Sequence, residues 1–172
     1  MTKWEMVLVF GLIACLLIIY LIVYFRDKKK IKTAGSEQKE ENKIAVQLRL
    51  QAYERLVLLA DRISLPNLVS RLNQGGLSAK EMQLLLLQTI RQEFEHNITQ
   101  QIYVSAESWE AVRNLKEQNL LIINQVASFL PENAQGADLC KALMDLLVQN
   151  PQASLHNIVS EAISYEAKKL IG

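Results

Sequence analysis

The stretch SAKEMQLLLLQTIRQEFEHNITQQI, at residues 78–102, decides the fold class. Ser78 and Glu81 form an S-x-x-E capping box ahead of an apolar run, which is a start signal for a helix. Apolar residues then recur three or four positions apart, at Leu87, Ile90, Phe94, Ile98 and Ile102. This period predicts a helix from Ser78 to about Gln101. The four leucines at 84–87 cover more than one face, which indicates the centre of a bundle or an oligomer contact.

The helical period holds on both sides of this stretch. Upstream it predicts a helix at about 41–63 with the stripe Ile44, Leu48, Ala52, Leu56, Leu59 and Ile63, then a break at Pro66 and a short helix to about residue 73. Downstream it predicts a helix at about 106–130, capped by Ser105, whose apolar stripe ends at Phe129, and shorter helices at about 137–148 and 153–171. We therefore expect an all-α protein with a compact bundle of five or six helices. Segments 84–87 and 120–123 would pack together at its centre.

A different kind of segment lies near the N-terminus. Residues 6–25, MVLVFGLIACLLIIYLIVYF, contain no charge. About 20 such residues in a helix span the hydrocarbon core of a bilayer. Trp4 lies at one edge of this run and Tyr24 at the other, and such rings favour the headgroup level. The run predicts one transmembrane helix.

The charges that flank this run predict its orientation. Residues 1–32 hold 6 Lys/Arg and 2 Asp/Glu, and the cations that follow the run are Arg26, Lys28, Lys29, Lys30 and Lys32. Lys and Arg stay in the cytoplasm, and these five could also bind anionic lipid headgroups. The expected order is a short external tail at 1–5, the transmembrane helix at 6–25, a basic juxtamembrane segment and linker at 26–43, and a helical cytoplasmic domain at 44–172. This arrangement places the protein in a bacterial inner (plasma) membrane.

Cys15 leaves an alternative open. Leu12, Ile13, Ala14 and Cys15 resemble the lipobox of a bacterial lipoprotein, in which the cysteine becomes lipidated and the protein is periplasmic. Ten more apolar residues follow Cys15, where a mature lipoprotein would turn polar. The membrane helix is therefore the favoured interpretation.

The chemistry-bearing residues of the rest of the chain are few. Residues 33–172 hold 13 Lys/Arg and 16 Asp/Glu, and this acidic balance disfavours nucleic acid as a partner. Cys140 lies among leucines and is expected to be a buried thiol. Glu93 and His96 match half of a di-iron carboxylate motif, but His156 lacks a glutamate three residues before it. We expect no catalytic, cofactor or metal site.

The segment between Glu93 and Trp109 is dense in amides and aromatic residues. His96, Asn97 and Gln100 form its candidate interaction face, since such mixtures occur at interfaces. In the favoured alternative, the amides cap a turn between helices while Tyr103 and Trp109 pack in the core.

Two quoted stretches carry a resemblance. EFEHNITQQIYVS at 93–105 and RISLPNLVSRL at 62–72, with Trp109, resemble a family of small uncharacterised single-pass membrane proteins from Bacteroidota. The resemblance implies an anchored organisation and no particular activity. The function that we expect is a membrane-anchored helical scaffold or adaptor module that binds a protein partner or itself. The alternatives are a small enzyme or ligand-binding helical domain, and the periplasmic lipoprotein.

Overall fold

The computed structural model describes residues 20–22, 24, 39–150 and 155–171. The chain divides into two compact units, Met1–Ala45 and Val46–Gly172. In the first unit, the described residues 20–22, 24 and 39–45 are helical. Most of the expected transmembrane helix at 6–25 and of the basic segment at 26–43 lies outside the described residues. Within the described ranges, no helix is both long enough and apolar enough to cross a membrane.

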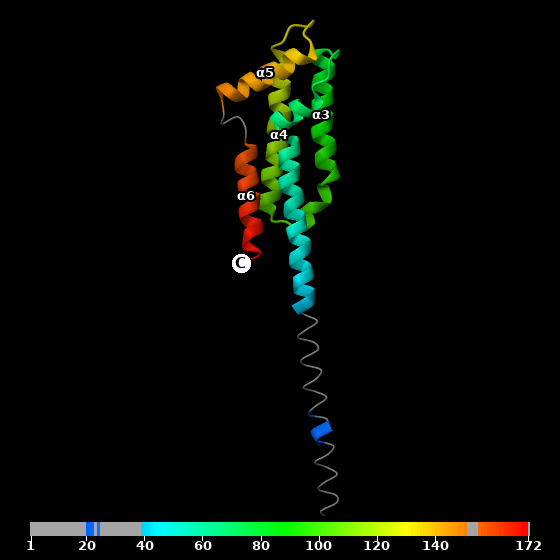
Figure 1. Ribbon diagram of the computed structural model, residues 1–172, viewed down its shortest axis with the longest axis vertical. Coiled ribbons are helices and arrows are strands. Elements are labelled where there is room, and N and C mark those ends of the chain that lie inside the picture. Colours follow the sequence, from blue (N-terminus) through cyan, green and yellow to red (C-terminus); the bar gives the residue numbers. More distant parts are fainter. Residues whose placement is uncertain (1–19, 23, 25–38, 151–154, 172) are drawn as a thin grey trace, which may run out of the picture. The chain divides into compact units, whose positions relative to one another are not determined.

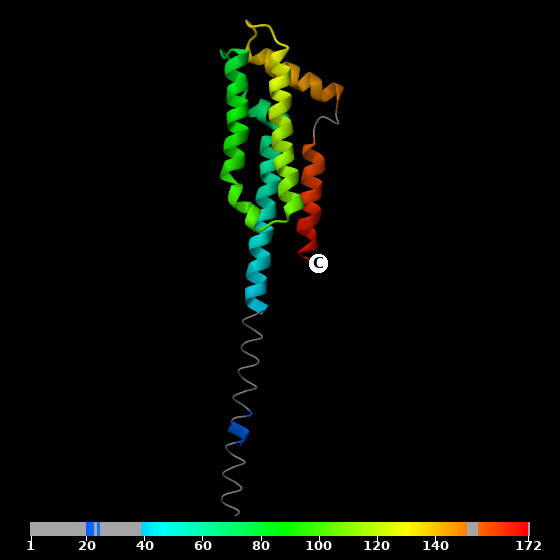
Figure 2. The ribbon, with the colours of Figure 1, turned by 180° about the vertical axis from the view of Figure 1, so that it is seen from behind.

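The second unit is a helical bundle, so the expected all-α class is confirmed. Its elements are a first helix at 46–63, α2 (Leu65–Leu72), α3 (Ala79–His96), the 3₁₀ helix η1 (Ile98–Ile102), α4 (Ala106–Ser128), α5 (Gly136–Gln149) and α6 (His156–Lys169). Figures 1 and 2 show α3 and α4 side by side and antiparallel, α6 beside α4, and α5 across one end. The described residues contain no strand, only an isolated bridge between Ser78 and Gln135.

The predicted break at Pro66 is confirmed, and side chains replace the backbone bonds that it removes. Proline has no N–H to donate to the carbonyl four residues earlier, that of Arg62. Arg71 Nη2 donates to this oxygen instead, at 2.7 Å. The carbonyl of Ile63 accepts from Asn119 Nδ2 at 2.8 Å, and the Asn119 side chain is buried. Side chains of α2 and α4 thus supply the hydrogen bonds that the last carbonyl groups of the first helix lack.

Two predicted helix starts are also confirmed. The Ser78 N–H donates to Glu81 Oε2 at 2.8 Å and the Glu81 N–H donates to Ser78 Oγ at 3.3 Å, which completes the capping box of α3. The bonds from Ser78 lower the pKa of Glu81. Ser105 Oγ accepts from the Ser108 N–H at 3.1 Å and caps α4. Both helix starts are therefore set by residues close in sequence.

The helix predicted to reach Gln101 ends at His96, which corrects that boundary. The Asn97 side chain donates to the Glu93 carbonyl at 2.9 Å, while the Asn97 N–H turns to the Phe94 carbonyl at 3.1 Å. An i→i−3 bond tightens the chain into a 3₁₀ turn, and η1 follows. Ile98 and Ile102 are consequently exposed and do not extend the apolar stripe.

The core confirms the expected centre in part. Leu86 and Ile123 are fully buried in one cluster formed by α3, α4 and their neighbours. Leu84 and Leu121 are exposed, because each helix buries only one side of its apolar run. Phe129, predicted as part of the α4 stripe, is 87% exposed at the C-cap of α4. The predicted centre is right, but the runs are amphipathic rather than buried on every side.

α5 starts one residue earlier than predicted, at Gly136. The Gly136 N–H donates to the Leu77 carbonyl at 2.7 Å. A Cβ at position 136 would lie 3.1 Å from that carbonyl oxygen and 3.1 Å from Met82 Cβ. Glycine therefore allows the backbone of α5 to approach the start of α3. Further along α5, Cys140 is buried as expected, and burial raises the pKa of its thiol.

Candidate functional site

The predicted interaction face does not form a single exposed surface. His96 is exposed, but the side chains of Asn97 and Gln100 are buried, with 8% and 9% of their surface accessible. Asn97 is buried because its amide caps the end of α3. The capping role of the amides predicted by the alternative is thus present at Asn97. Of the three side chains, only that of His96 is therefore exposed for contact with a partner.

The two aromatic residues of this segment differ from each other. Trp109 is half-buried, and its ring lies 5.0 Å from that of Phe94, tilted by 36°. Lys116 Nζ lies 4.5 Å from the centre of the Phe94 ring. Tyr103 is exposed. Core packing is therefore observed for Trp109 and not for Tyr103.

Glu93 contacts two arginines rather than a metal-ligand set. Its Oε1 accepts from Arg62, at 2.7 Å from Nη2 and 2.9 Å from Nε, and lies 3.6 Å from Arg71 Nη1. Glu93 is mostly buried, whereas the side chains of both arginines are partly exposed. Nowhere in the described ranges do three His, Cys, Asp or Glu side chains gather to hold a metal ion. One carboxylate between two guanidinium groups leaves a local excess of positive charge.

These side chains line an open hollow on the surface of the second unit. Its lining is Arg62, Thr89, Gln92, Glu93 and His96. The lining comes from the end of the first helix and from one face of α3. Arg71 of α2 is not part of this lining, but its Nη1 atom lies 3.6 Å from Glu93 Oε1. Exposed guanidinium groups bind carboxylates in bidentate geometry. The hollow is therefore suited to an acidic group of a partner, and we call it the Glu93 hollow.

A second polar cluster joins three helices around Glu166. Its Oε2 atom accepts from Tyr53 Oη at 3.0 Å, from Ser108 Oγ at 2.9 Å and from Ser105 Oγ. Tyr53 Oη in turn accepts from the Ser105 N–H at 3.0 Å. Tyr53 and Ser108 are buried. We call these four residues the Glu166 cluster.

The electrostatics of the Glu166 cluster indicate a structural contact. The bond from Ser105 chiefly lowers the pKa of Glu166, helped by bonds from Ser108 and Tyr53 and by the charge of Lys169, while desolvation opposes them. A carboxylate of lowered pKa that already accepts three hydroxyl groups is a poor general base. The Ser105 and Ser108 hydroxyl groups donate to this carboxylate, so neither has the histidine base of a nucleophilic serine. The cluster binds α6 to α4 and to the first helix.

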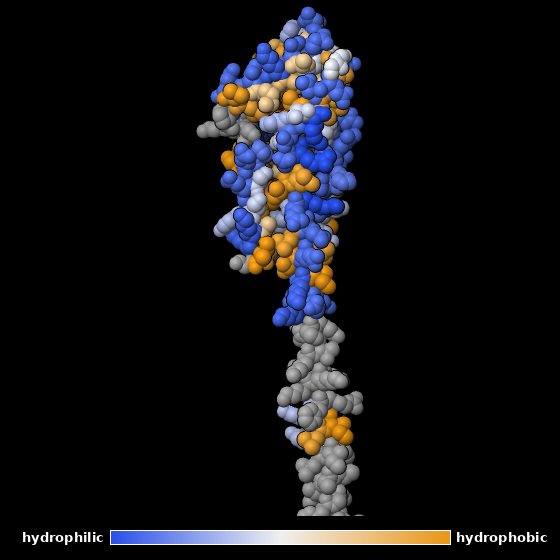
Figure 3. Space-filling view, viewed as in Figure 1, coloured by the Kyte–Doolittle hydropathy of each residue, from blue (hydrophilic) through white to orange (hydrophobic). Residues whose placement is uncertain are grey.

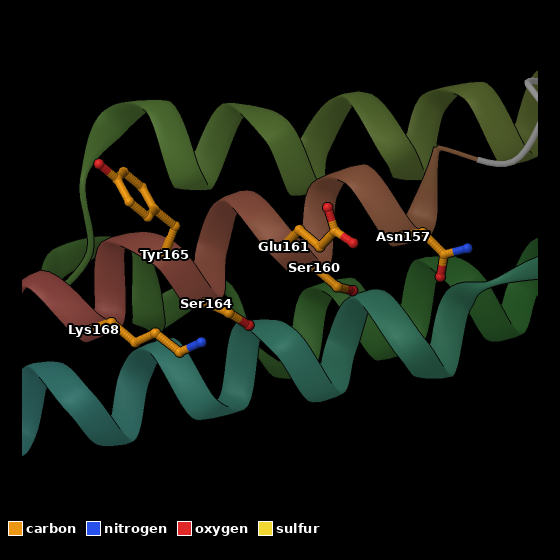
Figure 4. Close-up of a pocket in the computed structure, with 6 residues that line it drawn as sticks. All are labelled: Asn157, Ser160, Glu161, Ser164, Tyr165 and Lys168. Carbon is orange, nitrogen blue, oxygen red and sulfur yellow. The ribbon is translucent and has the colours of Figure 1, made fainter.

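A further hollow lies along α6. Its lining is Asn157, Ser160, Glu161, Ser164, Tyr165 and Lys168. Figure 4 shows Ser160, Ser164 and Lys168 on the side of α6 that faces the first helix, while Tyr165 points away from it. All six lining residues belong to α6, and the two charged ones, Glu161 and Lys168, point in different directions. This open surface supplies no set of groups for catalysis.

Sequence reasoning singled out Glu93, His96 and Ser105, but it missed the partners that these residues contact in the Glu93 hollow and the Glu166 cluster. Arg62 and Arg71 lie within one short stretch around Pro66. Because Pro66 has no N–H, the Arg62 carbonyl is left to accept a hydrogen bond from the Arg71 side chain. The partners of Glu166 are separated from it by 58 to 113 residues. No local spacing could have predicted that contact.

The fold and its surface sites define an all-α bundle with hydrogen-bonded polar clusters and an open hollow lined by Arg62 and Glu93. The chain belongs to DUF7935, a family of unknown function, which it matches over residues 1–170. No curated protein and no solved structure matches it. The expected membership in an uncharacterised family is confirmed. The attributions to Bacteroidota and to single-pass membrane proteins stay predictions.

Proposed function

We propose that the protein is a membrane-anchored helical interaction module, which holds its second unit at the cytoplasmic face of a bacterial inner membrane. The uncharged run at 6–25 supports the anchor, since its length suits a bilayer. The cations at 26, 28, 29, 30 and 32 support a cytoplasmic second unit and a contact with anionic headgroups. Anchoring raises the effective concentration of the module near other membrane components.

The Glu93 hollow is the surface that we propose for a protein partner. The observation that carries this proposal is the placement of Arg62 and Arg71 on the single carboxylate of Glu93, with His96 exposed beside them. The single carboxylate of Glu93 neutralises only one of the two positive charges of Arg62 and Arg71. A carboxylate of another protein would pair with the remaining charge. We therefore propose an acidic segment of another protein as the ligand of this hollow.

Substitutions at the exposed lining test the hollow without removing bonds that hold the fold. Gln92→Glu combined with His96→Glu adds negative charge to the hollow, and we expect several-fold less partner crosslinked to the full chain in its native membranes. The matched control is Gln88→Glu, the same change one helical turn earlier at an exposed position outside the lining. Equal partner recovery from the double variant and the control would contradict this placement.

The anchor is tested separately by a topology reporter fused after Gly172. A signal from a reporter active only in the cytoplasm is the expected result. A periplasmic signal would contradict the orientation. Intact-mass measurement of the same chain would then decide whether Cys15 carries lipid and residues 1–14 are lost.

A further inference from the structure

Exposed apolar side chains gather at one end of the second unit. Figure 3 shows them at the end where α6 finishes. They are Leu48 of the first helix, Ile98 and Ile102 of η1, Tyr103 directly after it, and Ile171 after α6. Ile102 and Ile171 are each 73% exposed. We call these five residues the end patch.

The Glu166 cluster places these residues at one end. Leu48 precedes Tyr53 by five residues, and Ile171 follows Glu166 by five, while Ile102 and Tyr103 immediately precede the segment that carries Ser105. Because Tyr53, Ser105 and Glu166 are bonded together, the residues just beyond them on each chain segment share one end of the bundle.

The end patch extends the apolar sides of the bundle past its core. Leu48 continues the spacing of Ala52 and Leu56, which are buried, but lies one turn further toward the start of the helix. Ile171 likewise follows the buried Ile163 and the partly buried Leu170. A core stripe normally stops where packing stops, so apolar residues that continue it indicate a surface that binds something apolar.

We propose that the end patch rests on the surface of the lipid bilayer. This inference rests on the membrane anchor of the proposed function. The helix that carries Leu48 is continuous from residue 39, and the chain enters the second unit along it at Val46, which is the end that bears the patch. The connection from Phe25 to Val46 is 20 residues, which span about 30 Å as a helix and at most about 70 Å extended. A connection of this length allows this end of the second unit to reach the bilayer.

The composition of the patch and its neighbours fits a headgroup interface. Tyr103 has an amphipathic ring, which is the kind that accumulates at this depth. Arg49 is exposed on the helix that carries Leu48, and Lys168 and Lys169 are exposed at the end of α6, just before Ile171. Cations beside apolar side chains favour binding to anionic lipid. Anionic lipid therefore matches the patch, because it offers an apolar interior and negatively charged headgroups together.

Phe129 supplies the matched control position. It is the most exposed large apolar side chain among the described residues, and it lies at the far end of α4 from Ser105. The 23 residues of α4 correspond to about 35 Å. Phe129 is thus an apolar side chain that is more exposed than any residue of the end patch but lies at the opposite end of α4.

The test uses the full chain in vesicles of phosphatidylethanolamine and phosphatidylglycerol, with Cys15→Ala and one spin-labelled cysteine at a time. Ile102→Cys, Ile171→Cys and Phe129→Cys receive the label, while Cys140 can stay because burial raises the pKa of its thiol and limits its reaction. Collision of each label with oxygen, which enters lipid, is compared with collision with a water-soluble nickel complex. We expect this ratio to be several-fold higher at positions 102 and 171 than at 129.

Three results would overturn the proposal. Equal ratios at all three positions, in chain that resists alkaline carbonate extraction, would refute docking and leave the anchor intact. Spin–spin broadening at 102 that disappears on dilution with unlabelled chain would show that a second copy covers the patch instead. Release of the chain by alkaline carbonate would refute the anchor, and with it the docking.

Discussion

Replacing Glu166 with alanine is expected to detach α6 from the bundle. The carboxylate of Glu166 accepts hydrogen bonds from Tyr53, Ser105 and Ser108, which belong to the first helix and to the start of α4. Apart from these bonds, α6 contributes mainly Val159 and Ile163 to the buried core. A helix with so small an apolar contact depends strongly on its polar attachment.

The size of the effect follows from burial and charge. A hydrogen bond to a charged group contributes about 1.5–3 kcal/mol, and bonds that share one acceptor atom do not add fully. Tyr53 is only 2% exposed, so its hydroxyl group would lose a partner with little access to water, at a cost of about 1–3 kcal/mol. Glu166 itself is partly exposed, which reduces the total. We expect Glu166→Ala to destabilise the attachment of α6 by about 2–4 kcal/mol.

Acid is expected to weaken the same attachment. The folded pKa of Glu166 is lowered, so the unfolded state binds a proton at a higher pH than the folded state. The stabilisation is therefore fully present above the ordinary glutamate pKa of about 4.3 and is lost as the pH falls through the lowered folded value. Glu166→Gln removes this titration, so the variant should lose less α6 protection than the wild type between about pH 6 and 3.

Amide hydrogen exchange of peptides from 155–171 measures this opening directly. A loss of about 2–4 kcal/mol corresponds to exchange roughly 30- to 700-fold faster where opening limits exchange. The control is Glu161→Ala, the same substitution at an exposed position of α6, which should change stability by less than about 0.5 kcal/mol. If both variants accelerate the exchange of α6 equally, the Glu166 cluster does not hold this helix.

The remaining predictions concern the core. Asn119→Ala would leave the last carbonyl of the first helix unpaired and cost about 1–3 kcal/mol in urea unfolding, whereas Asn124→Ala, at an exposed bond, should cost much less. Gly136→Ala should lower the melting temperature because its Cβ would meet backbone and a packed Met side chain, while Gly75→Ala, with nothing within 4 Å, should not. Cys140 should resist alkylation at neutral pH until denaturant is added, since burial raises its pKa; rapid reaction in the folded chain would contradict its placement.

Local patterns in the sequence were sufficient to predict the α-helices of the second unit but not the 3₁₀ helix η1. Ser78 and Ser105 cap helices through bonds to residues three positions later, and Pro66 breaks a helix through its own missing N–H. These helix ends can therefore be predicted from a few neighbouring residues. The all-α class follows from the period of the apolar residues, because a helix repeats its buried side every three or four positions. Membership in DUF7935 confirms one part of the resemblance carried by residues 62–72 and 93–105, namely that the family is uncharacterised.

The candidate sites were beyond such patterns. His96, Asn97 and Gln100 are neighbours in sequence, but α3 ends between His96 and Asn97, where the Asn97 side chain donates a hydrogen bond to the Glu93 carbonyl. His96 is consequently exposed, while Asn97 and Gln100 are buried. Leu84 and Leu86 have the same side chain two positions apart, and the packing of α4, α5 and α2 against α3 decides which is buried.

What the sequence determined by itself was thus the α-helices, most of their boundaries, membership in an uncharacterised family, and an uncharged run long enough for a membrane helix. The tertiary structure alone decided which polar residues meet. Glu166 with Tyr53, and Arg62 with Glu93, are pairs 113 and 31 residues apart. Their contact depends on how whole helices pack, because the burial that brings helices together is non-directional and leaves no mark in the local spacing of polar residues.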